Sequence, residues 1–175
     1  MKIIYLIFIS SFVLLSILSC ERSTNGDPPS NNDDGDDSTS YLIVDVRDGD
    51  TIELDDGQAI RLVGINTPEM NFGGTPEPCA QEATDFTTAE AQAKRCYLVY
   101  NTPVGDSIDY YGRTLAFVHI LPDSQCLNVE VCRAGWSDDW DDYPVRSDYE
   151  CQFEEAEEEA IAADRGIWDS YHNCE

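Results

Sequence analysis

Residues 41–65 decide the fold, and they read YLIVDVRDGDTIELDDGQAIRLVGI. The β-branched and aromatic run Tyr41–Val46 predicts a strand, and a polar turn follows it. Thr51–Leu54 predicts a second strand, which a short Asp-Gly hairpin turn connects to a third strand over Ala59–Ile65. Three adjacent short strands joined by tight turns form a meander.

The rest of the chain predicts a mixture of helices and strands. Proline and glycine mark residues 68–78 as an irregular loop. The apolar spacing then predicts, in order, a helix over Ala80–Lys94, strands over Tyr97–Tyr100 and Arg113–Ile120, a short helix over Asn128–Ala134 and a longer helix over Tyr149–Arg165. This order fits an α+β fold, a five-stranded Greek-key barrel of the OB type with three packed helices. From the pattern alone, an α+β sandwich fits nearly as well.

The first forty residues differ in composition from the rest. Residues 1–20 hold Lys2 and an almost unbroken apolar run that ends at Cys20. This pattern predicts a lipoprotein signal peptide with Cys20 as the lipidated residue, and an ordinary signal peptide or an uncleaved anchor is the alternative. Residues 21–40 contain no aliphatic or aromatic residue and predict a flexible acidic tether. We therefore expect residues 41–175 to form one domain, exported and lipid-anchored to the cell envelope at the outer membrane or the cell surface.

The predicted domain is strongly acidic. It holds eight basic and 29 acidic residues, which gives a formal charge of −21. Nucleic-acid binders draw much of their affinity from cationic contacts with phosphate. The charge is therefore the strongest argument against a protein that binds nucleic acid.

The cysteines predict disulfide bonds. Six follow Cys20, namely Cys79, Cys96, Cys126, Cys132, Cys151 and Cys174. An even count in an exported protein favours full pairing with no free thiol, and the connectivity stays open. One pair is excluded, because a helix between Cys79 and Cys96 would hold them roughly 20 Å apart, whereas a disulfide needs Cα atoms within about 7 Å. A zinc site is the alternative, but the sequence has no CxxC pair.

Three short segments carry the candidate chemistry, and they are Asp48–Thr51, Ile60–Glu69 and Asp109–Ala116. Together they offer two arginines, one glutamate and several oxygen ligands. A phosphodiester repels hydroxide and gains charge on its oxygens during hydrolysis. A hard cation and two guanidiniums offset both effects.

The predicted strand ends would bring Asp50, Arg61, Glu69 and Arg113 to one mouth of a barrel. Taken alone, Arg61 fits a solvated strand face and Glu69 fits a surface turn. Taken as a set, the residues predict hydrolysis of a phosphodiester by a metal-activated water.

The same segments resemble the staphylococcal nuclease (thermonuclease) family. The resemblance runs from about Leu42 to Trp168. It rests on motifs in one order, which are Asp48–Thr51, Arg61–Leu62, Thr67–Glu69, Tyr111–Arg113 with Leu115–Ala116, Leu127–Asn128 with Arg133–Gly135, and Gly166–Trp168. Each motif is weak alone, but the set in this order and spacing is specific. The resemblance implies a five-stranded OB-fold barrel with three helices.

The resemblance also implies an activity, the calcium-dependent hydrolysis of phosphodiester bonds in DNA and RNA. Glu69 would activate the attacking water. Arg61 and Arg113 would bind the phosphate and neutralise its growing charge. Tyr111 and Tyr143 are candidates for stacking on bases.

For calcium, the resemblance implies side-chain oxygens from Asp50 and Asn66 and the backbone carbonyl of Thr67. The family often has aspartate at position 66, so a neutral amide ligand predicts weaker calcium binding than two carboxylates give. Residues 70–78 contain no lysine or arginine, and Tyr110 stands where a lysine is common. Phosphate contacts beyond the scissile group are therefore poorly supplied.

Two other functions compete with the enzyme. One is a non-catalytic surface OB-fold module, and the other is a disulfide-rich adhesion lipoprotein. Neither needs a general base, so Glu69 together with Arg61 and Arg113 favours the enzyme. We expect a monomer with DNA and RNA as substrates, a membrane attachment through Cys20 and no obligate protein partner.

Overall fold

The computed structural model describes residues 40–101, 107–137, 144–169 and 174. All of them belong to one compact unit. The predicted signal segment with Cys20, the tether up to residue 39, and Tyr143 lie outside the described residues. Within the described ranges, no helix combines the length and the apolar character needed to cross a bilayer.

The predicted meander is present. β1 (Tyr41–Asp48) pairs antiparallel with β2 (Thr51–Leu54), and β2 pairs antiparallel with β3 (Ala59–Leu62). Two register shifts in β1 break the regular ladder and allow the strand to curve. β3 ends earlier than the sequence predicts, because the chain leaves the sheet soon after Val63 donates its N–H to the carbonyl of Ala116.

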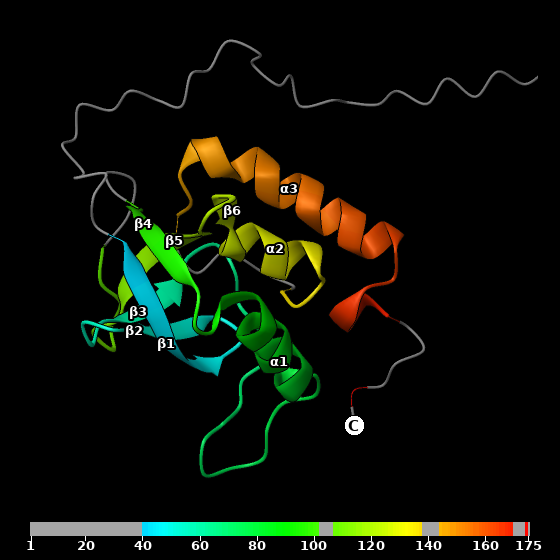
Figure 1. The fold of residues 1–175 in the computed structure, drawn as a ribbon. Helices are drawn as coiled ribbons and strands as arrows, with labels where there is room; N and C mark the ends of the chain where they lie inside the picture. Colours follow the sequence, from blue (N-terminus) through cyan, green and yellow to red (C-terminus); the bar gives the residue numbers. More distant parts are fainter. Residues whose placement is uncertain (1–39, 102–106, 138–143, 170–173, 175) are drawn as a thin grey trace, which may run out of the picture. The chain divides into compact units, whose positions relative to one another are not determined.

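The later strands close this sheet into a barrel (Figure 1). After helix α1 (Ala80–Ala91), β4 (Arg95–Tyr100) pairs with β1 and with β5 (Thr114–Ile120). β5 then runs parallel to β3, with Leu115 beside Arg61. Five strands thus form a closed ring, which confirms the α+β barrel and excludes the sandwich.

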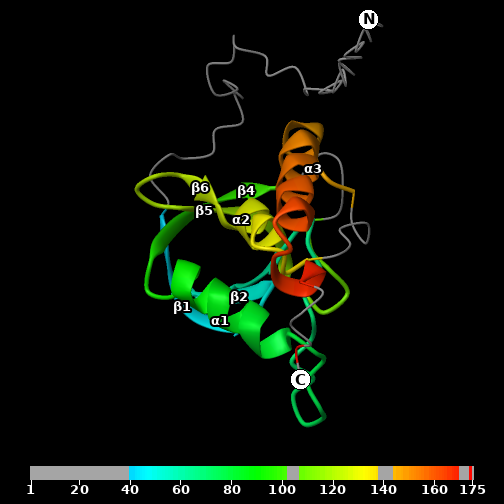
Figure 2. The same cartoon turned by 90° about the vertical axis from the view of Figure 1, so that its right-hand side faces the viewer.

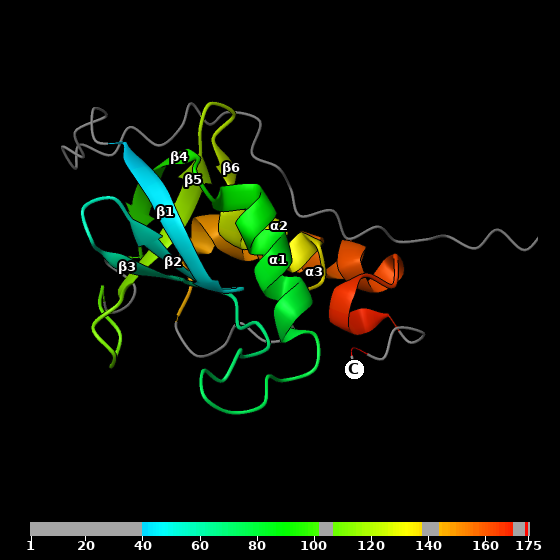
Figure 3. The same cartoon turned by 60° about the horizontal axis from the view of Figure 1, so that its bottom comes forward.

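The helices lie together to one side of β1, β2 and β3 (Figures 2 and 3). A two-residue strand, β6 (Gln125–Cys126), pairs with the end of β5 and leads into α2 (Leu127–Arg133). α3 (Ser147–Ala162) packs on α2, and a 3-10 turn, η1 (Gly166–Trp168), follows it. α3 buries Tyr149, Phe153, Ala156 and Ala160.

Two glycines join the end of α2 to η1. Gly135 has φ +81°, and a Cβ there would overlap with the carbonyl of Arg165. A Cβ on Gly166 would overlap with the carbonyl of Gly135. The N–H of Ile167 donates to that same carbonyl at 2.9 Å. The two backbones touch here, and only glycine permits the approach.

The predicted disulfide bonding is confirmed in part, since some of the cysteines pair and others do not. Cys79 forms a disulfide with Cys174, with Cα atoms 4.8 Å apart. Cys96, Cys126 and Cys132 carry free thiols in the core, so the prediction that no thiol is free is wrong. Burial raises the pKa of each of these thiols to about 12. A cysteine count cannot separate residues that pair from residues that pack as small hydrophobic groups.

Candidate active site

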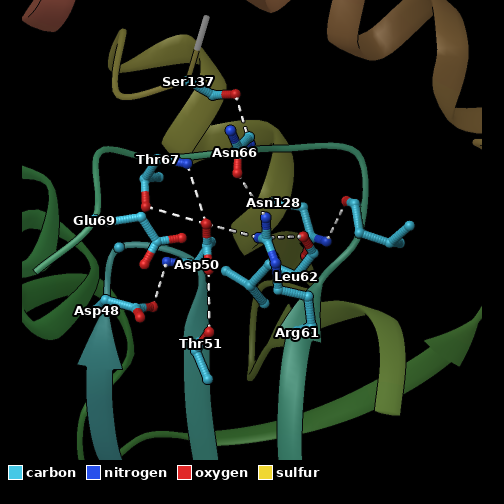
Figure 4. A network of polar contacts seen from close by, with 12 residues as sticks. Asp48, Asp50, Thr51, Arg61, Leu62, Asn66, Thr67, Glu69, Asn128 and Ser137 are labelled. Carbon is cyan, nitrogen blue, oxygen red and sulfur yellow. Dashed lines mark hydrogen bonds and ion pairs between the residues drawn. The ribbon is translucent and has the colours of Figure 1, made fainter. Parts of the chain in front are cut away.

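Five of the predicted site residues lie close together where β2 begins and β3 ends, and they are Asp50, Arg61, Asn66, Thr67 and Glu69 (Figure 4). Asp50 lies in the turn between β1 and β2, and Arg61 lies in β3. The loop that leaves β3 carries the other three members of this group, which are Asn66, Thr67 and Glu69.

A buried carboxylate lies at the centre of the site. Asp50 is 1% exposed, and its Oδ2 is 2.7 Å from Arg61 Nη1. The same oxygen accepts the N–H of Thr67 at 3.1 Å and the Thr67 hydroxyl at 3.2 Å. Oδ1 accepts the hydroxyl of Thr51 at 3.0 Å. Asp50 therefore orients an arginine, a strand and the exit loop of β3 together.

This carboxylate is short of positive charge. The pKa of Asp50 is raised to about 6, because burial and the neighbouring Asp48 raise it by more than Arg61 and the hydrogen bonds lower it. A cation placed near Asp50 would favour its ionised form.

Arg61 is held firmly in its position. Its side chain is buried, and Nη1 also donates to the carbonyl of Leu62 at 3.3 Å. Nη2 donates to Asn66 Oδ1 at 3.0 Å. The N–H of Asn66 in turn donates to the hydroxyl of Ser137, just beyond α2, at 3.0 Å. The helical layer thus helps to place residue 66.

Arg113 approaches the site from the start of β5. Its Nε pairs with Asp109 Oδ2 at 2.6 Å, and its Nη1 donates to the Thr51 hydroxyl at 2.8 Å. Asp109 Oδ1 also accepts the backbone N–H groups of Tyr111 and Arg113. Burial raises the pKa of Asp109, but these hydrogen bonds and the Arg113 charge outweigh burial and lower the pKa below its ordinary value. Asp109 is therefore a charged anchor for the turn and for Arg113.

Two tyrosines extend outward from Arg113. The Cζ of Arg113 lies 5.4 Å from the ring centre of Tyr111, and the ring of Tyr110 meets that of Tyr111 edge-on. Tyr111 is 79% exposed and Tyr110 is 94% exposed. Exposed aromatic rings beside an arginine can stack on nucleic-acid bases.

Glu69 lies exposed at the rim of the site. Its N–H donates to the Glu77 carboxylate at 3.0 Å, and the Glu77 N–H donates to the Glu69 carbonyl at 2.9 Å. Partial desolvation, followed by the charge of Asp50, raises the pKa of Glu69, while Arg61 and Arg113 lower it. A raised pKa makes a carboxylate a stronger proton acceptor.

Three residues of this network were not predicted as members of the site. Thr51 and Asp109 stand inside the quoted segments, but the local pattern does not show what they contact. Ser137 meets Asn66 across 71 positions of sequence, and no local signal marks that contact.

The oxygen atoms of the site are of the chemical types that bind calcium. The carboxylate of Asp50, the amide oxygen of Asn66 and the carbonyl of Thr67 are all ligands that Ca²⁺ accepts. The raised pKa of the buried Asp50 also fits a place for a cation. In the described part of the chain, no group of three or more His, Cys, Asp or Glu could hold a metal ion. Such a site would therefore depend on neutral ligands and water.

The closed five-stranded barrel with three packed helices is an α+β fold of the OB type. Residues 59–170 match the family described as staphylococcal nuclease homologue, and the chain belongs to this family, which is of nuclease type. The match confirms the resemblance drawn from the sequence motifs. Among curated proteins, no match to the chain was found.

Proposed function

We propose that the protein is a calcium-dependent endonuclease that hydrolyses phosphodiester bonds in DNA and RNA. One observation carries the proposal. The guanidinium of Arg61 contacts Asp50 directly, and that of Arg113 contacts it through the hydroxyl of Thr51. The charge of Asp50 raises the pKa of Glu69, and the charges of the two arginines lower it. Two guanidiniums beside a carboxylate base are suited to the attack of water on a phosphodiester.

Each charged residue has a separate role in this proposal. Arg61 and Arg113 bind the phosphate oxygens and offset the negative charge that grows on them in the transition state. Glu69 takes a proton from the attacking water. Its exposed position at the rim leaves room for that water and for the substrate.

Calcium and base stacking complete the proposal. Asp50, Asn66 and Thr67 would hold Ca²⁺, which supplies a Lewis acid beside the phosphate when it is bound. Tyr111 and Tyr143 would stack on bases, at about 1–3 kcal/mol per base. Stacking does not need a positive protein surface, so it suits a domain with a formal charge of −21.

The test is calcium-dependent release of acid-soluble nucleotides from DNA and from RNA. Glu69→Gln should lower kcat by about 10²–10⁴-fold, the usual contribution of a general base. Arg61→Lys and Arg113→Lys should also lose substantial activity, because an ammonium cannot reproduce the planar fork. Glu82→Gln is the matched control, since it makes the same change at an exposed position in α1. Near-native turnover in all three site variants would overturn the proposal, and binding without turnover in the wild type would favour the OB-fold binding module.

We also propose that the protein is exported and anchored to the cell envelope by a lipid on Cys20, with a monomeric domain. The apolar run that ends at Cys20 supports this location, and so does the Cys79–Cys174 disulfide. Cys20→Ser should abolish incorporation of a labelled acyl chain and release the domain from membranes. A wild-type protein that takes up no label would show that the assignment is wrong.

A further inference from the structure

The two arginines reach Asp50 by different routes. Arg61 meets the carboxylate directly, with Nη1 2.7 Å from Oδ2. Arg113 reaches it through one hydroxyl, because its Nη1 lies 2.8 Å from Thr51 Oγ1, which lies 3.0 Å from Asp50 Oδ1. Thr51 is 2% exposed, so its hydroxyl is shielded from competition by bulk water.

Chemistry fixes the direction of both hydrogen bonds. A guanidinium can only donate, and an ionised carboxylate can only accept. The hydroxyl of Thr51 therefore accepts from Arg113 and gives its single proton to Asp50. The backbone of Thr51 also pairs with Arg61 across β2 and β3. Thr51 thus links Arg113 to the carboxylate that Arg61 meets directly.

A second contact holds the guanidinium of Arg113 from the other side. Its Nε lies 2.6 Å from Oδ2 of the buried Asp109. With Nε and Nη1 both engaged, the plane of the guanidinium is set. The two contacts leave Nη2 without a hydrogen bond to any described residue.

We propose that Thr51 is a positioning residue for Arg113. Its hydroxyl sets the plane in which the guanidinium meets the phosphate, and it joins that plane to Asp50. The inference rests on the proposed nuclease function. A positioned group displaced by 1 Å can cost on the order of 10²-fold in rate.

Removal of the hydroxyl is the direct test. Thr51→Val keeps the branched shape and should lower kcat about 10- to 10²-fold, with a smaller change in KM. Thr51→Ser keeps the hydroxyl and should retain most of the activity. Wild-type kcat in Thr51→Val would overturn the inference. Thr51→Ala is the second variant if Thr51→Val does not fold.

A double-mutant cycle separates this role from a general effect on the fold. When Arg113 is already replaced by alanine, adding Thr51→Val should lower kcat by less than about twofold. The guanidinium that the Thr51 hydroxyl positions is absent from this variant. An equal loss in both backgrounds would show that Thr51 acts through Asp50 or through the fold, and it would overturn the inference.

NMR of ¹⁵N-labelled arginine side chains tests the contact between Arg113 and Thr51 without measuring activity. The Arg113 side-chain N–H signals should be slowly exchanging in the wild type and in Thr51→Ser, and faster in Thr51→Val and Thr51→Ala. Unchanged signals in both hydroxyl-deletion variants would overturn the inference. A wild type that shows the slow signals but hydrolyses neither DNA nor RNA would contradict the proposed nuclease, while it would leave the placement of Arg113 by Thr51 supported.

Discussion

At the scale of single residues, position 66 would control how much negative charge faces the calcium ion that we propose. Asn66 accepts from Arg61 through Oδ1 and donates its N–H to Ser137, so its amide is well placed but neutral. Asp50 is then the one carboxylate among the three proposed calcium ligands.

Asn66→Asp should tighten calcium binding, on the order of tenfold, because a second carboxylate adds a formal charge to the ligand set. Calorimetric titration with calcium measures the change. Asn71→Asp is the matched control, since it makes the same substitution in the exposed loop and should leave the affinity unchanged. An unchanged or weaker affinity in Asn66→Asp would mean that residue 66 does not ligate the metal.

His119 predicts a pH effect on stability. Its Nδ1 is 2.9 Å from the carbonyl of Ser124, and its Nε2 is 2.7 Å from the hydroxyl of Tyr149, so the neutral ring donates to one and accepts from the other. Tyr97 stacks on the ring. Burial lowers the pKa of His119, and the Ser124 carbonyl opposes this only in part. A protonated ring could no longer accept from Tyr149.

Because the folded pKa is the lower one, the stability that His119 contributes is fully present above its unfolded pKa, about 6.5. It is lost as the pH falls through the folded pKa. The difference in unfolding free energy between the wild type and His119→Gln should therefore shrink as the pH falls below about 6.5. Urea unfolding at several pH values measures it, and the comparison removes the common contribution of Asp50. A constant difference between pH 7.5 and 5.5 would contradict the expectation.

At the scale of elements, the join between α2 and η1 depends on Gly135. Gly135→Ala should lower the free energy of unfolding by more than about 2 kcal/mol, because a left-handed conformation costs about 1–2 kcal/mol and the new Cβ also meets the Arg165 carbonyl. Gly57→Ala is the control, since Gly57 has φ +86° but open space around it. Gly57→Ala should lower the free energy of unfolding only by the cost of the left-handed conformation. Equal losses in the two variants, measured by thermal or urea unfolding, would mean that the backbone contact contributes nothing.

Local patterns were sufficient to predict the five barrel strands and the three α-helices, since β-branched runs, turns and apolar stripes are local properties. The two-residue β6 and the 3-10 turn η1 are too short to carry such a pattern, and they were not predicted. The approach of Asp50 to Arg61 could also be predicted, because both belong to the meander. The parallel pairing of β3 with β5 could not, since no local feature marks it. The same limit hid the contact between Thr51 and Arg113, which forms only when that pairing closes the barrel. The free state of Cys96 was missed because a count of cysteines contains no information on distance.

At the scale of the whole molecule, the formal charge of −21 on residues 41–175 should repel DNA at long range. Added salt weakens this repulsion, since the Debye length falls from about 30 Å at 0.01 M to about 10 Å at 0.1 M. Salt also weakens the contacts of arginines with phosphate. The two effects oppose each other, so kcat/KM should first rise with salt and then fall.

A salt titration at saturating calcium tests this expectation. A small substrate with one phosphodiester and one negative charge is the control. The initial rise of kcat/KM with salt should be weaker for this substrate than for DNA. A decrease from the lowest salt onward with DNA would show that the arginine contacts outweigh the overall field of the domain.

The disulfide between Cys79 and Cys174 spans 95 residues and encloses everything from the start of α1 onward in a covalent ring. One proteolytic cut inside that ring leaves both fragments attached. A cut anywhere between Cys79 and Cys174 would therefore leave Arg113 covalently joined to Arg61 and Glu69. The strand pairings of β1 with β4 and of β3 with β5 would hold the same parts of the proposed active site together without covalent bonds.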